Sequence, residues 1–193
     1  MLSISSRSST QGKILQEIEN LNADPAVHGI IVQMPLGTDE GIKVDSHLVT
    51  NKVDPDKDVD GLTTINEGKV ATGILDSFIP CTPAGCLDLI KRSGVKIEGA
   101  RAVVVGRSQI VGTPVAELLK WNHATVTICH SKTQNLEEIV GQADILVVGI
   151  GQPQFIQGSW IKAGAVVIDA GINSIPDSTK KSGQYLSSHT NCF

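Results

Sequence analysis

The amino-acid sequence predicts an α/β protein whose larger part is a parallel β-sheet covered by helices on both faces. Between residues 101 and 169, short apolar runs alternate with helical patterns and short loops. That alternation is typical of βαβ units, which build parallel sheets. Further upstream, "HGIIVQMPL" is short, β-branched and ended by Pro35, as a buried parallel strand would be. We therefore expect a partial amino-terminal α/β lobe followed by a lobe built on a parallel sheet.

The upstream lobe is expected to begin with an amphipathic helix over residues 10–21, closed by Asp24-Pro25. Its apolar residues recur on one face: Ile14, Leu15, Ile18 and Leu21. The buried strand at 28–36 comes next. A weaker helix at 42–53 and an acid-rich loop at 54–62 follow.

The second lobe is expected to open with a well-delimited helix in "CTPAGCLDLIKRSG". Thr82 has the character of an N-cap, Pro83 suits the first helical position, and Gly94 suits the stop. Strands are then predicted at 102–105, 125–128, 145–148 and 165–169, with helices at 113–121 and 136–143. The expected domains are therefore 1–82, a linking helix with the sheet lobe over 83–184, and a tail at 185–193 without a periodic pattern.

Composition and charge exclude several classes of protein. The net charge of -4 and the aromatic content of 3% argue against nucleic acid as a partner, because that partner calls for basic surface and stacking side chains. The apolar runs are far shorter than the roughly 20 residues of a membrane span. Four cysteines without matched spacing indicate free thiols in a reducing compartment, and no metal site is expected. The predicted location is the cytosol, with the mitochondrion as the alternative.

The stretch "AVVVGRSQIVGTPVAELL" poses the question of a phosphate site, because Gly106 and Gly112 lie on the turn between a strand and a helix. Such a turn lets backbone amides and the positive end of the helix approach a phosphate. NAD-binding proteins usually carry an acid about 20 residues after the glycine turn. This chain instead has "ICHSKT", so Arg107, Ser131 and Lys132 favour the additional 2′-phosphate of NADP. The alternatives are an ordinary tight turn and solvated surface residues.

Several motifs, taken together and in this order, closely resemble the bifunctional methylenetetrahydrofolate dehydrogenase/methenyltetrahydrofolate cyclohydrolase family. The resemblance covers roughly residues 10–184 and implies a folate lobe and a Rossmann-type, NADP-binding lobe. It implies hydride transfer from 5,10-methylenetetrahydrofolate to NADP, followed by hydrolysis of the methenyl product to 10-formyltetrahydrofolate. The motifs are "HGIIVQMPL", "DKDVDGL", "FIPCTPAGCLDLI", "VVVGRSQIVGTP", "TVTICHSKT", "ADILVVGIGQP" and "VIDAGIN".

The resemblance also implies the site residues. Gln33 would lie at the catalytic centre, and Val32 and Met34 would line the folate cleft. Asp60 would hold the pterin ring through its nitrogens, a task that suits a carboxylate acceptor. On the cofactor side, the implied NADP contacts come from Gly106, Arg107, Ser108 and Ser131, with Ile172 near the nicotinamide.

The sequence departs from the family pattern in two places. The family's general base is a lysine in a Y-x-x-x-K motif well upstream of the "VQMPL" strand, but only Lys13 precedes Gln33 and the only tyrosine is Tyr185. After "SGQ" the family's closing motifs are also replaced by "YLSSHTNCF". We therefore expect a chain truncated at both ends with impaired activity, which forms a homodimer or associates with full-length subunits. The alternative is an inactive fragment that binds NADP or a subunit.

Overall fold

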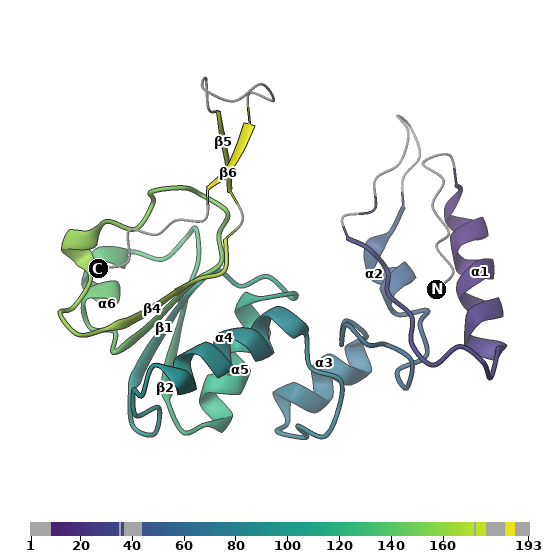
Figure 1. Cartoon of the computed structure of the whole chain (residues 1–193), viewed down its shortest axis with the longest axis horizontal. Coiled ribbons are helices and arrows are strands. Elements are labelled where there is room, and N and C mark those ends of the chain that lie inside the picture. Colours follow the sequence, from purple (N-terminus) through teal and green to yellow (C-terminus); the bar gives the residue numbers. More distant parts are fainter. Residues whose placement is uncertain (1–8, 35, 37–43, 172, 177–183, 188–193) are drawn as a thin grey trace. The chain divides into compact units, whose positions relative to one another are not determined.

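The computed structural model describes residues 9–34, 36, 44–171, 173–176 and 184–187 (Figure 1). Backbone contacts divide the chain into two compact units, Met1–Pro80 and Cys81–Phe193, called unit 1 and unit 2 below. The division falls ahead of the expected boundary after residue 82, because the first helix of unit 2 already begins at Cys81.

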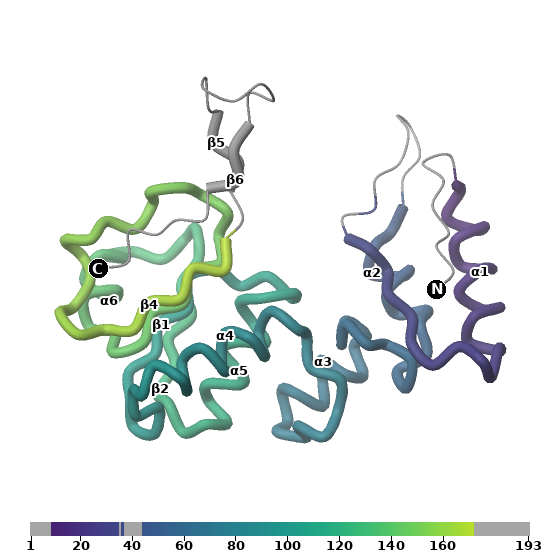
Figure 2. The backbone as a smooth tube through the Cα atoms, viewed as in Figure 1, coloured from purple at the N-terminus to yellow at the C-terminus, as the bar shows by residue number. Residues whose placement is uncertain are grey.

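Unit 2 contains a four-stranded parallel sheet in the order β2-β1-β3-β4. Apolar β-branched residues dominate the two central strands, which is typical of a sheet buried on both faces. Figure 2 follows the backbone through these strands and the helices that connect them. The prediction of four parallel strands is confirmed, with these bounds: β1 Arg101–Val105, β2 Thr125–Cys129, β3 Ile145–Val148 and β4 Val166–Asp169.

Helices cover both faces of this sheet, as predicted. Alternate residues of β1 enter different cores, because successive side chains of a strand point to opposite faces. Ala102 and Val104 pack with α4 and α5, whereas Val103 and Val105 pack with residues of α6 and of the short 3-10 helix η1. Figure 1 shows α4 and α5 together on one side of the sheet. The bounds of these helices are α4 Cys81–Arg92, α5 Gly112–Trp121, α6 Leu136–Gly141 and η1 Gly158–Trp160.

The ends of α4 bear out part of the prediction. The helix begins at Cys81, so Thr82 lies in its first turn and the prediction of Thr82 as N-cap is wrong. Pro83 is nevertheless tolerated there, since backbone N–H groups of a first turn have no helical acceptor. Gly94 adopts a φ of +80° just past the end of the helix, which is the conformation that glycine supplies at a helix stop.

Unit 1 consists of α1 (Gln11–Ala23), α2 (Ser46–Thr50) and α3 (Thr64–Ala71). The helix predicted at 10–21 is confirmed as α1, and the Thr10 side chain caps it by accepting a hydrogen bond from the Lys13 amide. Its predicted apolar face packs into a small core around four buried side chains: Ile18, Ile30, Val49 and Val53.

The strand predicted at 28–36 is wrong in its extent. In the described residues it is reduced to one isolated parallel bridge between Ile30 and Asp58, where the Ile30 amide donates to the Lys57 carbonyl at 2.7 Å. A strand requires a continuous ladder of hydrogen bonds with a neighbour, and here the described chain supplies a single pairing. Ile31 is 56% exposed, so the segment is not buried on both faces. Pro35 lies outside the described residues.

Two helices of unit 1 differ from the expectation. The predicted helix at 42–53 is only α2, which starts where the Asp45 carboxylate accepts from the Leu48 amide at 3.0 Å; residues 42 and 43 lie outside the described range. Helix α3 was not predicted, because its apolar residues are too sparse to form a periodic pattern. Thr63 caps it by accepting from the Asn66 amide at 3.3 Å.

The carboxyl-terminal region contains two short strands that the sequence analysis did not predict. Strands β5 (Asn173–Pro176) and β6 (Gln184–Ser187) pair antiparallel. Strand β6 extends into the predicted tail at 185–193, since main-chain hydrogen bonds pair such strands without an apolar period. Among the described helices, none is both long and apolar enough to cross a bilayer.

Candidate functional site

The first candidate site is the glycine turn between β1 and α5. Gly106 adopts a φ of +116°, and a Cβ atom there would lie 2.8 Å from the Gly149 carbonyl oxygen. At Gly112 a Cβ atom would lie 2.3 Å from the Gly106 carbonyl oxygen and 2.9 Å from the Arg107 amide nitrogen. Both contacts are with backbone, which cannot move aside as a flexible side chain can. The turn therefore folds tightly over the start of α5 because both positions lack a side chain.

Ser108 organises the start of α5 from within the turn. Its Oγ accepts hydrogen bonds from the Val111 amide at 3.2 Å and the Gly112 amide at 3.3 Å. The backbone carbonyl of Ser108 also accepts from the Thr113 amide at 3.0 Å. The Ser108 hydroxyl proton can still donate to a ligand, since these contacts use only the oxygen as acceptor.

The amides of residues 107–110 point to what this turn can bind. No acceptor in the described part of the chain takes a hydrogen bond from any of them. Amides at the start of a helix, together with the helix dipole, form a binding place for an anion. Arg107 is exposed on the same turn, so a positive side chain and backbone donors are available together.

A second turn lies at the same edge of the sheet, after β2. The register pairs Val105 with Cys129, and the Gly106 amide donates to the Cys129 carbonyl at 2.9 Å. Since β1 and β2 are parallel, the segments after Val105 and Cys129 emerge side by side. The structure thus brings the predicted residues Arg107 and Ser131 to one edge of the sheet, as the sequence analysis required.

Hydrogen bonds within the second turn hold its shape. The His130 amide donates to Thr133 Oγ1 at 2.9 Å, and the Thr133 amide donates to the His130 carbonyl at 2.8 Å. The Lys132 amide donates to His130 Nδ1 at 3.1 Å, so this ring nitrogen acts as an acceptor. Ser131 and Lys132 remain exposed. No carboxylate follows β2 in this turn, and its exposed groups are hydrogen-bond donors.

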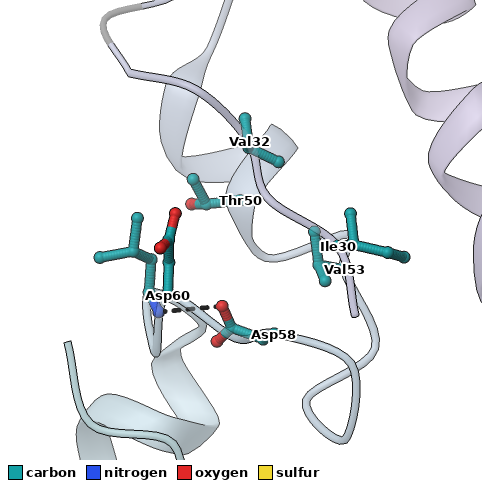
Figure 3. A pocket seen from close by; sticks show the side chains of 7 residues that line it. Ile30, Val32, Thr50, Val53, Asp58 and Asp60 are labelled. Carbon is teal, nitrogen blue, oxygen red and sulfur yellow. Dashed lines mark hydrogen bonds between the residues drawn. The ribbon is translucent and has the colours of Figure 1, made fainter. Parts of the chain in front are cut away.

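The third candidate site is a hollow in unit 1, called the Asp60 hollow. Figure 3 shows the Asp60 carboxylate extending into it on the side of Thr50. The hollow offers only about 10 Å³, about the room of one water molecule and far less than the roughly 300 Å³ at the lower end of small-molecule pockets. It can therefore admit only a small polar group of a larger ligand. Its lining residues are Ile30, Val32, Thr50, Val53, Asp58, Asp60 and Leu62.

The acidity of Asp60 is shifted by this environment. Burial raises the pKa of the Asp60 carboxyl above its ordinary value, and the nearby negative charge of Asp58 raises it further. Both effects disfavour the charged carboxylate. A partner that donates hydrogen bonds to Asp60 would compensate for this cost, which makes the side chain a candidate ligand-binding acceptor.

Asp58 is a buried residue that the sequence analysis did not single out. It is 4% exposed, and its carboxylate accepts from the Leu62 amide at 3.2 Å and the Thr63 amide at 2.8 Å. It also accepts from Asn66 Nδ2 at 2.9 Å. Figure 3 shows the bond to the main chain as a dashed line. The density of acid in "DPDKDVDGL" was the one signal in the sequence, but it does not separate a buried acid from exposed ones.

The Lys57 side chain has a structural role within unit 1. Its Nζ donates to three main-chain carbonyls at the end of α1, those of Leu21 at 3.1 Å, Asn22 at 2.7 Å and Asp24 at 2.8 Å. An ammonium group has three protons to donate, so these bonds use all of them. Lys57 therefore fastens the acidic loop to α1 and is not a candidate proton acceptor.

The other residues predicted for the folate and cofactor sites are not all found at these sites. Val32 lines the Asp60 hollow, but Gln33 and Met34 are not among its lining residues. Gln33 is exposed and its Nε2 donates to the Met34 carbonyl at 3.2 Å. Ile172 lies outside the described residues. Within the described residues, no three His, Cys, Asp or Glu side chains gather as metal ligands would.

Comparison with known proteins identifies two matching family models. Residues 80–189 match the tetrahydrofolate dehydrogenase/cyclohydrolase NAD(P)-binding domain, and residues 2–60 match the catalytic domain of the same name. The two models divide the chain close to the boundary between unit 1 and unit 2.

Individual proteins give the same picture. The chain is 66% identical over 180 residues to the cytoplasmic C-1-tetrahydrofolate synthase of Drosophila melanogaster, covering 93% of this chain and 18% of that protein. It is 65% identical over 180 residues to the protein of the same name from Spodoptera frugiperda, covering 93% and 19%. The chain thus spans less than a fifth of the length of these relatives.

A solved structure also aligns closely with the fold. The methylenetetrahydrofolate dehydrogenase-cyclohydrolase of Trypanosoma brucei, complexed with NADP cofactor and an inhibitor, superposes with a TM-score of 0.85. The two sequences are 39% identical, and the match covers 93% of this chain and 60% of that one. The arrangement of helices and strands is therefore that of a protein solved with a dinucleotide.

Proposed function

The chain belongs to the tetrahydrofolate dehydrogenase/cyclohydrolase family, and on that premise we propose that unit 2 binds NADP and unit 1 binds a folate. The complete protein then oxidises 5,10-methylenetetrahydrofolate with NADP and hydrolyses 5,10-methenyltetrahydrofolate to 10-formyltetrahydrofolate. The observation that carries the proposal is the glycine turn after β1, where Gly106 and Gly112 allow a tight backbone turn and the amides of 107–110 donate to no acceptor in the described part of the chain.

The donor set at the edge of the sheet fits NADP. The amides of 107–110 and the start of α5 suit the pyrophosphate, whereas Arg107 and Ser131 suit the 2′-phosphate because they bring charge and donors. An acid at the end of β2, which would favour the unphosphorylated ribose of NAD, is absent from the described turn at 130–133. When bound, NADP supplies the hydride acceptor. The predicted contact of Ile172 with its nicotinamide stays a prediction.

The folate side rests on Asp60. A half-buried carboxylate accepts hydrogen bonds from ring N–H and amino groups, and pterin has both. Val32 lines the same hollow, and we propose it as an apolar contact of the ring. The placement of Gln33 at the catalytic centre and of Met34 in the folate cleft rests on the family resemblance alone and stays a prediction. The Asp60 hollow offers only about 10 Å³, so only a polar edge of the pterin reaches the Asp60 carboxylate there.

A second candidate function is a binding module that takes NADP without turnover. The lining of the Asp60 hollow contains neither lysine nor histidine among the described residues, and the Lys57 ammonium is committed to α1. Hydrolysis needs a positioned proton acceptor, whose loss typically lowers the rate about 10²- to 10⁴-fold. Weak cyclohydrolase activity of this chain is therefore part of the proposal.

The proposals for the cellular location and the assembly of this chain each rest on one observation. The two insect relatives are named cytoplasmic, which supports the cytosol as the location of this chain. We propose a homodimer or a complex with full-length subunits, because Trp121 and Ile128 are 41% and 40% exposed. Apolar side chains exposed on α5 and on the edge strand β2 favour pairing with another chain.

The test is to titrate the whole chain with NADP and, separately, with NAD, and to measure its melting temperature at each ligand concentration. A ligand present at 100 times its Kd stabilises by about 2.7 kcal/mol, so a clear rise in the melting temperature is expected for NADP. Arg107→Ala should weaken NADP about 10- to 100-fold and NAD far less, since only NADP carries the 2′-phosphate.

The control is Arg92→Ala, which removes another exposed guanidinium, one that pairs with Asp88 on α4. Equal losses for NADP and NAD in Arg107→Ala would contradict the role of this side chain. Assays of methylenetetrahydrofolate oxidation and of methenyl hydrolysis on the same samples then separate an enzyme from a binding module.

A further inference from the structure

Asp58 occupies a position that the proposed function does not use. Its carboxylate is buried, and three donors converge on it from the following turn and from α3: the amides of Leu62 and Thr63, and Asn66 Nδ2. A buried carboxylate is stable only when its oxygens are paired in this way. Asp58 is therefore held in one orientation.

These bonds close the loop that carries Asp60. Asn66 Nδ2 also donates to the Pro55 carbonyl at 3.0 Å, so one amide group joins the start of the loop, Asp58 and α3. On the other side of Asp60, Gly61 has a φ of +66°, and a Cβ atom there would lie 2.6 Å from the Phe78 carbonyl oxygen. The backbone is thus restrained both before and after Asp60.

We propose that Asp58 is a positioning residue, which holds the Asp60 carboxylate toward the Asp60 hollow by anchoring the loop to α3. This inference rests on the proposed function only in assigning Asp60 to folate. The anchoring itself is a property of unit 1 and is testable without a ligand.

A consequence of this arrangement is electrostatic. Asp58 is the charged group that adds to burial in raising the pKa of the Asp60 carboxyl. The other side chains that line the hollow, from the segment 30–32, from 50–53 and from Leu62, carry no charge. Removing the charge of Asp58 should therefore lower the pKa of Asp60, because one of its two causes disappears.

The competing explanation is that Asp58 only stabilises unit 1. In that case its replacement lowers the stability of unit 1 and speeds hydrogen exchange in α1 as much as at the Gly61 and Leu62 amides. A melting temperature alone does not separate the two explanations, whereas faster exchange confined to the loop does.

The experiment is a carbon-13 NMR titration of the aspartate carboxyl groups in the whole chain. The Asp60 signal is identified by its loss in Asp60→Asn. Asp58→Asn is expected to lower the pKa of Asp60, and the control Asp56→Asn, which removes an exposed carboxylate from the same loop, should lower it less. An Asp60 titration that is the same in wild type and Asp58→Asn contradicts the electrostatic effect assigned to Asp58, and unchanged hydrogen exchange at the Gly61 and Leu62 amides of this variant overturns the proposal.

Asn66→Ala keeps the charge of Asp58 and removes one of its hydrogen-bond donors. This variant tests the anchoring of the loop if Asp58→Asn does not fold. Hydrogen exchange at the Gly61 and Leu62 amides should become faster, while exchange in α1 stays the same. Unchanged exchange at these two amides overturns the proposal.

Binding of tetrahydrofolate is measured on the same variants and is expected to weaken about tenfold, equal to about 1.4 kcal/mol. Undiminished binding by Asp58→Asn also counts against the proposal. Failure of the wild-type chain to bind tetrahydrofolate contradicts the proposed function instead, and leaves the titration and exchange results to decide the role of Asp58.

Discussion

Unit 1 and unit 2 build their candidate sites by different physical means. In unit 2 the edge of a sheet with two apolar cores carries a glycine turn, and the site exists because backbone atoms approach closely. In unit 1 the apolar core is small, and hydrogen bonds of Lys57 and Asp58 connect the segments around the Asp60 hollow. Added bulk at the glycine turn should therefore damage the site of unit 2. In unit 1, loss of charged or polar groups should damage the site, as should added bulk at Gly61.

The largest effect is expected from Gly112→Ala. The new methyl group would lie 2.3 Å from the Gly106 carbonyl oxygen, and only a shift of the turn or of α5 can relieve the overlap. We expect a loss of about 3 kcal/mol or more in the free energy of unfolding of unit 2, together with loss of NADP binding. Urea unfolding followed by circular dichroism measures the stability.

Gly85→Ala is the matched control, since nothing lies within 4 Å of a Cβ atom at this position in α4. There the substitution should stabilise the protein by about 0.5 to 1 kcal/mol, because alanine favours helix more than glycine does. Similar unfolding curves for the two variants would contradict the steric basis assigned to the glycine turn.

Lys57→Met should have the next largest effect. It keeps most of the side-chain length but leaves the carbonyls of Leu21, Asn22 and Asp24 without the ammonium donor. Hydrogen bonds to charged groups contribute about 1.5 to 3 kcal/mol, and partial solvation of the carbonyls keeps the expected loss near 2 kcal/mol. Hydrogen exchange at the end of α1 and thermal unfolding measure it.

Lys13→Met removes the same charge from an exposed position on α1 and should change the stability by less than about 0.5 kcal/mol. An equal effect of both variants would mean that charge alone, rather than the three carbonyl contacts, accounts for the loss. Unit 1 would then depend on its apolar core as unit 2 does.

The smallest effects are expected from two aspartates whose contribution to stability depends on pH. Replacing one should stabilise unit 1, whereas replacing the other should destabilise unit 2. Burial raises the pKa of Asp60, so its ionisation opposes folding at neutral pH. Asp60→Asn should stabilise unit 1 above the folded pKa, by less than about 1 kcal/mol given solvent screening. The gain should vanish as the pH falls below the ordinary value of 3.8.

Asp144 of unit 2 behaves in the opposite way. A hydrogen bond from Lys162 and another from the Arg101 amide lower the pKa of this carboxyl. Its contribution is present above the ordinary value of 3.8 and is lost as the pH falls through the lowered pKa. Asp144→Asn should cost less than about 1 kcal/mol at pH 7, since Lys162 is exposed and Asp144 is only partly buried. Unfolding curves between pH 3 and pH 7 that give both variants the same sign would contradict this assignment.

How well the sequence predicted each unit depends on how far apart along the chain its interacting residues lie. Strands β1 to β4 and their helices were predicted closely, because apolar periodicity is read from neighbouring residues. The strand at 28–36 was overestimated, since its composition indicates burial but not the number of pairing partners. Helix α3 was missed because its stabilising partners are polar caps rather than an apolar stripe.

The residues of the candidate sites were likewise predicted where local sequence patterns identify them and missed where contacts in the fold decide. The glycine turn, Arg107 and Ser131 were predicted as one site, because parallel strands bring their carboxyl ends to one edge. Asp60 was selected through the family resemblance, but Asp58 was not. Two acids in one loop look alike in a sequence, and only burial and hydrogen bonds distinguish them.

By itself, the sequence determined the parallel sheet, the order of its strands along the chain and the glycine turn, because each depends on local patterns and on the absence of a side chain at Gly106 and Gly112. Only the tertiary structure decided that Lys57 fastens the acidic loop to α1 and that Asp58, rather than Asp60, is buried and fully paired. The physical reason is that the Lys57 ammonium meets carbonyls more than thirty residues earlier in the chain. Such a contact leaves no periodic trace in the sequence.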